Sequence, residues 1–390
     1  MKNSYCSHYA WAEIDLDALS FNLTQVRNLV GKEKKILAVV KANAYGHGLV
    51  PVAHELEALG IDFFGVAFLE EGVRLRTAGI TKPIVILGGV FPSQGERVIA
   101  FNLTPVVYDL AAAQSLEAEG RRQRKRIPVH IKIDTGMNRL GVPDEAVKEF
   151  FVRLKGLDHL EIEGILSHFS SVHLRNAESQ RFTKSQAERY RTGLAALRDL
   201  SITAPLLHMG NSASIIEGVM PELTMVRAGL ILYGAYPSKD LEAAVPLKPM
   251  MTLKATVIQI RAVAPDVAIG YGRTFSTKRT SRIATITAGY GDGYTCRLSN
   301  RGTVLIRGKP APVVGSVCMD LTMVDITEVP DAKVGDEVVL MGSQEGATIS
   351  ANDLAEWSEI IPYEILCGVS QRVPRIYKKH GEIAPKENEG

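Results

Sequence analysis

Short apolar runs alternate with amphipathic segments from residue 35 to about residue 230 of this 390-residue chain. Eight runs have the length and apolar character of buried strands, and the segments between them place apolar residues at the i, i+3, i+4 spacing of a helix. Eight parallel strands joined by helices favour a closed barrel over an open sheet. The predicted strands are Lys35–Val40, Asp62–Ala67, Pro83–Leu87, Thr104–Val107, Pro128–Ile133, Glu161–Leu166, Pro205–His208 and Leu223–Arg227.

The pattern changes after about Tyr233. The runs that follow are β-rich and are separated by Gly, Pro and Asp turns, which predicts a second, mostly antiparallel β-domain. These runs include Met251–Ile258, Arg282–Thr287, Gly302–Ile306, Ala311–Val314, Leu321–Ile326 and Glu337–Met341. We therefore expect an α/β protein with an N-terminal (β/α)8 TIM barrel over residues 12–240, a β-domain over 241–380 and a polar tail over 381–390.

Two segments flank these domains. Trp11–Asp15 is predicted to be a strand and Leu16–Val30 a helix, neither counted in the barrel, and residues 1–11 are expected to pack with the β-domain. The stretch from Pro237 to Pro249 contains three prolines and is the predicted linker.

Composition excludes several classes of partner. The chain has 45 Lys and Arg against 43 Asp and Glu, a net charge of +2 that indicates neither a nucleic-acid nor a membrane partner. Its one basic run, Arg121–Arg126, follows a helix-like segment, and we interpret it as that helix's charged end. The N-terminus lacks an apolar signal region, and the four cysteines form no C-x-x-C pair, so we expect reduced thiols in a cytoplasmic protein.

One lysine stands where a strand ends. Lys41 follows the apolar run Ile36–Val40 and precedes the small and glycine-rich stretch Ala42–Gly48. A lysine that leaves an apolar wall for a polar crevice is partly desolvated, which lowers its pKa and frees the amine for imine chemistry.

Other polar residues occur at the same ends of later strands. The active sites of such barrels form at the C-terminal ends of the strands, so these side chains are candidates for one site. His168 and His173 lack acidic or cysteine companions at metal spacing, and we predict no metal site. The candidates are Lys132 and Asp134 at the end of the fifth strand, Arg139 after it, His168 after the sixth, Asn211 and Ser212 after the seventh, and Arg227 at the end of the eighth.

The sequence resembles the alanine racemase family of fold-type III pyridoxal-phosphate enzymes along nearly its whole length. Ala38–Gly48 resembles the family's cofactor-lysine motif, and Lys132–Gly141 resembles its fifth-strand signature. The resemblance implies that Lys41 holds pyridoxal 5′-phosphate as an imine and that Arg139 reaches the cofactor O3′ and the substrate carboxylate, oriented by a carbamylated Lys132. It also implies a phosphate cradle formed by Tyr45, Asn211, Ser212, Gly229, Leu230 and Tyr363.

The resemblance further implies that Arg227 hydrogen-bonds the pyridine nitrogen of the cofactor. A guanidinium stays protonated, so the ring nitrogen must accept and remains unprotonated. The cofactor is then a weaker electron sink, which suits racemisation and limits transamination.

Three motifs of the second domain resemble the family too. Gly270–Thr274 resembles the motif of the catalytic tyrosine, here Tyr271, and the family places it beside a histidine that matches His168. Tyr290 would line the entrance, and the Met319 backbone N–H would meet the substrate carboxylate. Because the family supplies this tyrosine from the partner subunit, the resemblance implies a homodimer with composite sites.

The predicted function is a two-base interconversion of L-alanine and D-alanine by Lys41 and Tyr271, supplying D-alanine for peptidoglycan. A broad-specificity racemase would carry a secretory signal and Asn at the positions of Lys132 and Leu140, and a decarboxylase would carry a late glycine-rich phosphate loop and a cysteine–acid pair. A non-catalytic pyridoxal-phosphate carrier would lack the β-domain. The departures from the family pattern, at His173, Cys296 and Ser316, map to the entrance corridor.

Overall fold

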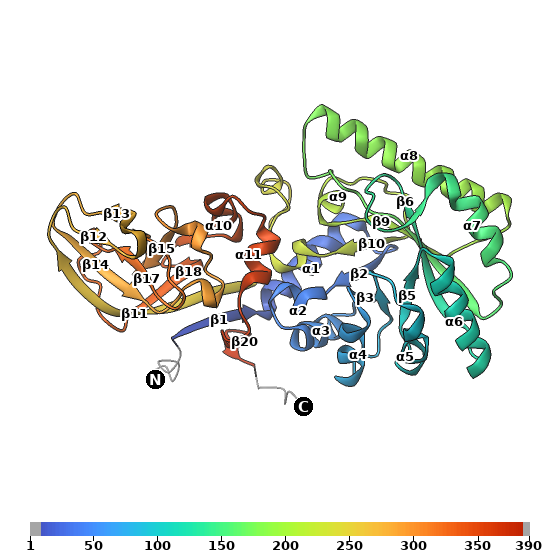
Figure 1. Ribbon diagram of the computed structural model, residues 1–390, viewed down its shortest axis with the longest axis horizontal. Helices are drawn as coiled ribbons and strands as arrows, with labels where there is room; N and C mark the ends of the chain where they lie inside the picture. Colours follow the sequence, from blue (N-terminus) through green and yellow to red (C-terminus); the bar gives the residue numbers. More distant parts are fainter. Residues whose placement is uncertain (1–8, 385–390) are drawn as a thin grey trace.

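The computed structural model describes residues 9–384, and Figure 1 shows a closed barrel beside a second, β-rich domain. Every neighbouring pair of barrel strands is parallel, and the pairing of β5 with β6 closes the ring. The predicted (β/α)8 barrel is thereby confirmed. Its strands are β2 (Lys35–Val39), β3 (Phe63–Val66), β4 (Ile84–Ile86), β5 (Thr104–Val107), β6 (Ile127–Asp134), β8 (Leu160–Leu166), β9 (Leu206–Gly210) and β10 (Met225–Ala228).

Helices cover the outside of the ring. They are α3 (Leu49–Ala58), α4 (Leu69–Thr77), α5 (Gly95–Ala100), α6 (Leu110–Gln123), α7 (Val147–Leu154), α8 (Ala177–Asp199) and α9 (Ser212–Ile216), while the short β7 (Val142–Pro143) extends the sheet beside β6. The short segment α2 (Lys41–Tyr45) directly follows β2. The basic run lies at the end of α6, where Arg121 pairs with Glu117 at 3.0 Å, in agreement with its interpretation as a helix end.

The helix α1 (Leu16–Val30) comes before the barrel in sequence but occupies the place of its eighth helix. It contacts α3, α9 and the turn η3 (Leu230–Tyr233) that follows β10. The Asp15 side chain caps its N-terminus by accepting from two backbone N–H groups. The Asn22 side chain donates to the carbonyls of Leu232 and Lys248 at 3.1 and 2.8 Å, which ties the helix to the end of the barrel.

The second domain is built on a sheet with the order β16-β15-β18-β11-β1-β20-β21. Only the β1–β20 pair is parallel, so the predicted, mostly antiparallel domain is confirmed. Its strands are β1 (Ala10–Asp15), β11 (Met251–Val263), β12 (Ala268–Ile269), β13 (Phe275–Ser276), β14 (Ser281–Ile286), β15 (Thr303–Ile306), β16 (Lys309–Pro312), β17 (Thr322–Asp325), β18 (Glu337–Gln344), β19 (Ala347–Ile349), β20 (Arg375–Lys379) and β21 (Glu382–Ile383).

Both ends of the described chain join this sheet. β1 pairs with β11 and β20. Residues 12–15, which the predicted bounds assign to the barrel domain, therefore belong to the second sheet. The predicted polar tail over 381–390 begins with a strand, because β21 pairs with β20 through Ile383 and Lys378. Residues 1–8 of the predicted N-terminal packing segment and residues 385–390 of the tail lie outside the described residues.

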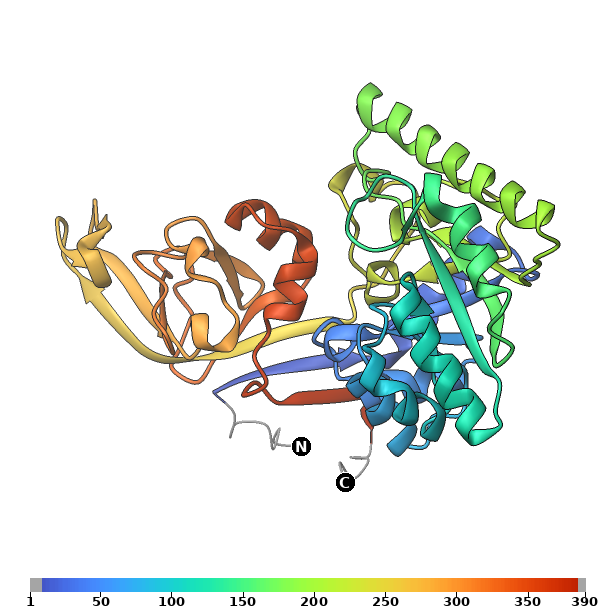
Figure 2. The ribbon, with the colours of Figure 1, turned by 45° about the vertical axis from the view of Figure 1, so that its right-hand side comes forward.

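Two helices of the second domain face the barrel, α10 (Ala351–Ser358) and α11 (Pro362–Gly368). Figure 2 shows α11 between the β-domain and the barrel, and α11 contacts α2. The Asn352 side chain on α10 exchanges hydrogen bonds with the backbone of Tyr236 at 2.9 and 3.2 Å, just before the proline-containing linker. The second domain therefore contributes directly to the mouth of its own barrel.

Candidate active site

Basic side chains from several strands gather at one end of the barrel. Burial lowers the pKa of Lys41, and the nearby charge of Arg139 lowers it further, while the Glu71 carboxylate acts in the opposite direction. Burial and the charges of Arg227 and Arg139 likewise hold the pKa of His168 well below its ordinary value. These residues are thus close enough to influence one another's protonation, and His168 is a neutral imidazole.

The backbone after Lys41 has an unusual conformation that shapes the site. The four residues Ala42–Tyr45 have φ values between 51° and 56°, so they form a left-handed turn. Such a conformation costs roughly 1–2 kcal/mol per non-glycine residue and persists only where its surroundings impose it. Here the Glu71 carboxylate accepts from the Ala42 N–H at 2.7 Å, and the Asn43 side chain accepts from the Leu49 N–H at 2.9 Å.

Arg227 is the most firmly held of the basic residues. It is buried, and its Nη1 donates to the ring Nδ1 and the carbonyl of His208, both at 3.0 Å. Its Nη2 donates to the carbonyl of Ser167 at 2.7 Å and to Nδ1 of His168 at 2.9 Å. Burial lowers the pKa of Arg227 to about 10, so it stays charged at neutral pH.

Lys132 and Arg139 add positive charge beside it. Burial and the charges of Arg227 and Arg139 lower the pKa of Lys132 to about 8. The nearby Asp134 carboxylate accepts from two backbone N–H groups, those of Gly136 at 2.8 Å and Asn138 at 3.2 Å. The site therefore carries excess positive charge, which suits an anionic ligand.

A polar cradle lies beside this cluster, where β9 and β10 end. The Ser212 hydroxyl accepts from the backbone N–H groups of Gly229 and Ile231, both at 3.3 Å. A Cβ atom on Gly229 would lie 2.8 Å from the Tyr45 hydroxyl and 3.8 Å from the Ser212 hydroxyl, so the space there exists only because residue 229 is glycine. Leu230 lies between the two backbone donors and opens η3.

Asn211 holds the backbone next to this cradle. Its side chain caps α9 by accepting from the Ser214 N–H at 3.1 Å, and its amide donates to the carbonyl of Phe169 at 3.2 Å. The amide is thus engaged with the protein on both sides. Asn211 positions Ser212, which begins the helix.

Two aromatic rings pack against Tyr45, the tyrosine of the cradle. Tyr45 stacks on Tyr233 with ring centroids 4.8 Å apart, and the Tyr363 ring on α11 lies 5.9 Å from it. Burial raises the pKa of Tyr45, so its hydroxyl is a neutral donor. Burial also raises the pKa of Tyr363 to about 12. Both hydroxyls therefore remain protonated and able to donate.

The predicted residues of the second domain lie apart from this cluster. Tyr271, Tyr290 and Met319 are 76%, 47% and 53% exposed. Hydrogen bonds join their loops, since the Tyr290 N–H donates to the carbonyl of Cys318 at 2.9 Å and the Ser316 side-chain hydroxyl donates to the carbonyl of Tyr271 at 2.9 Å. Figures 1 and 2 place the β12–β13 hairpin, which brackets the turn Tyr271–Arg273, at the end of the second domain remote from the barrel.

The three departures from the family pattern divide between the domains. His173 follows β8 in the barrel, whereas Cys296 is exposed on the second domain and Ser316 bonds the Tyr271 carbonyl. The Asp320 carboxylate accepts from the Arg372 guanidinium at 2.8 Å and supports the Met319 loop.

Two residues near Lys41 escaped the sequence analysis. Glu71 is 29 residues from Ala42 along the chain, and no local pattern marks it as a partner. Cys367 on α11 lies near enough to Lys41 for the ammonium to lower its pKa, although burial raises that pKa overall. Only the docking of α11 on the barrel brings this thiol to the site.

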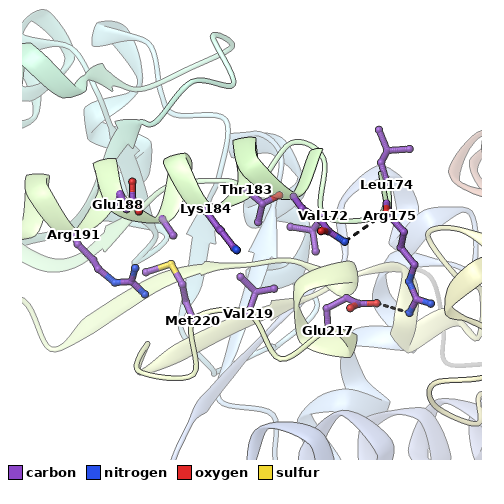
Figure 3. A pocket seen from close by; sticks show the side chains of 12 residues that line it. Val172, Leu174, Arg175, Thr183, Lys184, Glu188, Arg191, Glu217, Val219 and Met220 are labelled. Carbon is purple, nitrogen blue, oxygen red and sulfur yellow. Dashed lines mark hydrogen bonds and ion pairs between the residues drawn. The ribbon is translucent and has the colours of Figure 1, made fainter. Parts of the chain in front are cut away.

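The structure also contains a cavity of about 360 Å³ that is separate from this site. Figure 3 shows it beside α8, with Lys184 from the helix facing Val219 and Met220, and an Arg175–Glu217 ion pair of 2.6 Å at one end. None of the predicted site residues lines it. Among the described residues, no helix is long and apolar enough to cross a membrane, and no three metal-binding side chains gather.

Comparisons with known proteins identify the family. Residues 14–237 match the family model described as "Alanine racemase, N-terminal domain", and residues 250–377 match "Alanine racemase, C-terminal domain". The alanine racemase of Geobacter sulfurreducens is 46% identical over 367 residues, which cover 94% of this chain and 96% of that protein.

Solved structures agree over the whole fold. The alanine racemase of Clostridium difficile 630 superposes with a TM-score of 0.89 at 39% identity, covering 97% of this chain and 98% of that one. An alanine racemase from Bartonella henselae with covalently bound pyridoxal phosphate superposes with a TM-score of 0.84 at 30% identity, covering 95% of this chain and 100% of that one. On both comparisons, this chain belongs to the alanine racemase family of enzymes.

Proposed function

We propose that this enzyme interconverts L-alanine and D-alanine with pyridoxal 5′-phosphate, using Lys41 and Tyr271 as two bases. The observation that carries the proposal is Lys41 at the mouth of the barrel, close to the guanidinium groups of Arg139 and Arg227 and followed along the chain by Tyr45 of the polar cradle. The Bartonella henselae relative, which holds pyridoxal phosphate covalently, supports the choice of cofactor.

The residues at the barrel mouth fit this cofactor. The Tyr45 and Ser212 hydroxyls flank a space that a Cβ on Gly229 would fill, and Ser212, which accepts from the Gly229 and Ile231 N–H groups, keeps its own O–H to donate. Such donors at the ends of the last two strands suit a phosphate dianion. Tyr363 would complete the cradle with its protonated hydroxyl.

Arg227 would face the pyridine ring of the cofactor. Among the described residues, its Nη atoms have acceptors and its Nε has none, so one N–H remains for the ring nitrogen. Because the guanidinium stays charged, that nitrogen would only accept. Arg139 and the Met319 backbone N–H would hold the substrate carboxylate.

Lys132 would orient Arg139 after carbamylation. With a pKa of about 8, about a tenth of its amine is neutral at pH 7, far more than for an ordinary lysine, and a neutral amine is the form that reacts with carbon dioxide. The resulting carbamate is an anion that pairs with Arg139 and removes the repulsion between the two cations.

The bound cofactor would withdraw electrons from the substrate's α-carbon and so acidify its α-proton. Lys41, with its lowered pKa, would take or return that proton on one face. Tyr271 would act on the opposite face, and inversion follows because the proton leaves one side and returns from the other. Since His168 accepts from Arg227 at Nδ1, its own proton is on Nε2, where it can donate to the tyrosine oxygen.

The position of Tyr271 favours a homodimer with composite sites. In its own chain the tyrosine lies on a highly exposed turn at the end of the second domain remote from the barrel. Tyr271 of the partner subunit would therefore supply the second base, and Tyr290 of the partner subunit would line the entrance. The product D-alanine would serve peptidoglycan synthesis in the cytoplasm, in keeping with the free thiols of the described cysteines.

Two measurements on the purified enzyme test the proposal. Incubation with pyridoxal phosphate should produce a visible absorption band, and borohydride should remove the band and fix the label on Lys41. L-alanine should then become a mixture of both enantiomers, whereas L-serine at the same concentration should react much more slowly. A colourless protein, or unchanged L-alanine, would refute it, and equal rates would favour a broad-specificity racemase.

A further inference from the structure

A line of buried polar groups runs through the barrel interior behind Arg227. Nη1 of Arg227 lies 3.0 Å from Nδ1 of His208, and Nε2 of His208 lies 2.8 Å from Nδ1 of His130. Nε2 of His130 lies 3.1 Å from a carboxylate oxygen of Glu163. Both histidines are fully buried, whereas the Glu163 side chain is 28% exposed. Two histidines thus link Arg227, in the candidate site, to a carboxylate that reaches solvent.

The direction of each hydrogen bond follows from chemistry. A guanidinium can only donate, so Nδ1 of His208 accepts and the proton of this neutral imidazole is on Nε2. That N–H must donate to Nδ1 of His130, which places the proton of a neutral His130 on Nε2, facing Glu163. A proton on Nδ1 of His130 would force the His208 proton onto Nδ1, against the N–H of Arg227. Only one arrangement satisfies all four groups.

The backbone is adapted to this line of groups. Val129 pairs with Ile162 and His130 pairs with Gly164, so Glu163 is an extra residue in its strand, a β-bulge. The β9–β10 register shifts too, and places Met209 between the paired residues His208 and Gly210. Bulges of this kind redirect side chains and are frequent beside active sites.

Gly164 provides the space for the first histidine. A Cβ at residue 164 would lie 2.7 Å from Nδ1 of His130, so the ring sits there only beside a glycine. The layers inside such barrels are usually filled by branched apolar residues, which would pack here without the cost of burying polar groups. Stability alone therefore does not explain two histidines and a carboxylate at this place.

We propose that Glu163 and His130 are positioning residues that act through His208 to hold Arg227 charged and correctly oriented toward the cofactor. The chain of hydrogen bonds is polarised in one direction, with the carboxylate at its end stabilising the distant guanidinium. Neither residue touches the substrate or cofactor in the proposed site. The part of this inference that concerns the cofactor rests on the proposed function, whereas the hydrogen-bond directions do not.

The first test needs no cofactor. ¹⁵N NMR of the histidine rings in cofactor-free enzyme should find His130 and His208 neutral, each with its proton on Nε2. A proton on Nδ1 of His208, or a doubly protonated His130, would overturn the arrangement. This result is independent of whether the enzyme binds pyridoxal phosphate.

The second test measures the dissociation constant of pyridoxal phosphate. Glu163→Gln keeps an acceptor but removes the charge, and we expect about tenfold weaker binding, as is typical when an outer partner of a binding group is lost. Glu161→Gln, on the exposed side of the same strand, is the matched control and should bind like wild type. Wild-type affinity in Glu163→Gln would refute the positioning role, and no binding by the wild type would refute the proposed function instead.

A double variant separates this role from a general structural effect. If Glu163 acts through Arg227, then Glu163→Gln should add little to the loss caused by Arg227→Lys. Independent losses that multiply would show that Glu163 contributes by another route. Thermal unfolding of each variant checks that the barrel is intact, and if Glu163→Gln does not fold, the NMR result on the wild type still decides the direction of the hydrogen bonds.

Discussion

Replacing Gly229 by alanine should block the phosphate cradle while leaving the rest of the site in place. The added Cβ would lie 2.8 Å from the Tyr45 hydroxyl, closer than side-chain atoms normally approach. Tyr45 cannot retreat easily, because its ring is stacked on Tyr233 at 4.8 Å and faces Tyr363 at 5.9 Å. The φ of Gly229 is −117°, so the change acts through occupied space and not through a left-handed backbone.

The size of the effect follows from the donors that would be lost. A hydrogen bond to a charged group contributes about 1.5–3 kcal/mol, and each 1.4 kcal/mol changes a dissociation constant about tenfold. Displacing the Tyr45 hydroxyl from the phosphate should therefore weaken cofactor binding by about 10- to 100-fold. Inserting a methyl group into a packed region should also lower the free energy of unfolding by about 1–3 kcal/mol.

The assay compares two ligands that differ only in the phosphate. Pyridoxal phosphate and pyridoxal are each titrated into cofactor-free enzyme, and binding is followed by absorbance. Gly229→Ala should weaken the first and leave the second within about twofold, because pyridoxal makes no contact with the cradle. Gly156→Ala is the control, since a Cβ there meets nothing within 4 Å. Unchanged pyridoxal phosphate affinity, or an equal loss for both ligands, would refute our placement of the phosphate.

Three further predictions concern the chemistry and the assembly. Tyr271→Phe should bind the cofactor normally while its racemisation rate falls roughly 10²- to 10⁴-fold, and near-normal turnover would assign the second base to another residue. The pKa of Lys132 is about 8 in the folded protein and 10.5 ordinarily, so the unfolded chain binds more protons than the folded one between these pH values. In enzyme free of bicarbonate and cofactor, Lys132 should therefore make the free energy of unfolding rise over that pH range. Urea unfolding should find a smaller rise in Lys132→Met, and identical pH slopes would contradict the buried amine. Mixing inactive Lys41→Ala and Tyr271→Phe subunits under proven exchange should restore activity to roughly a quarter of the sites, whereas no recovery would place both bases in one chain.

The site residues that could be predicted are those that follow or end an apolar strand pattern in the sequence. Lys41, Lys132, His168 and Arg227 all lie at the C-terminal ends of barrel strands, and their mutual effects on pKa follow from that topology. The left-handed turn at Ala42–Tyr45 was not predictable, because its propensity is unfavourable and distant groups such as Glu71 impose it.

The sequence by itself determined the elements whose causes are local. The helix at Leu16–Val30 and the strand at Thr104–Val107 have the bounds that apolar spacing predicts, since a cap and a period are properties of neighbouring residues. Tertiary structure alone decided that Ala12–Asp15 joins the second sheet and that a bulge directs Glu163 toward His130. Each of these depends on pairing between segments far apart in the chain, which hydrophobic periodicity does not encode.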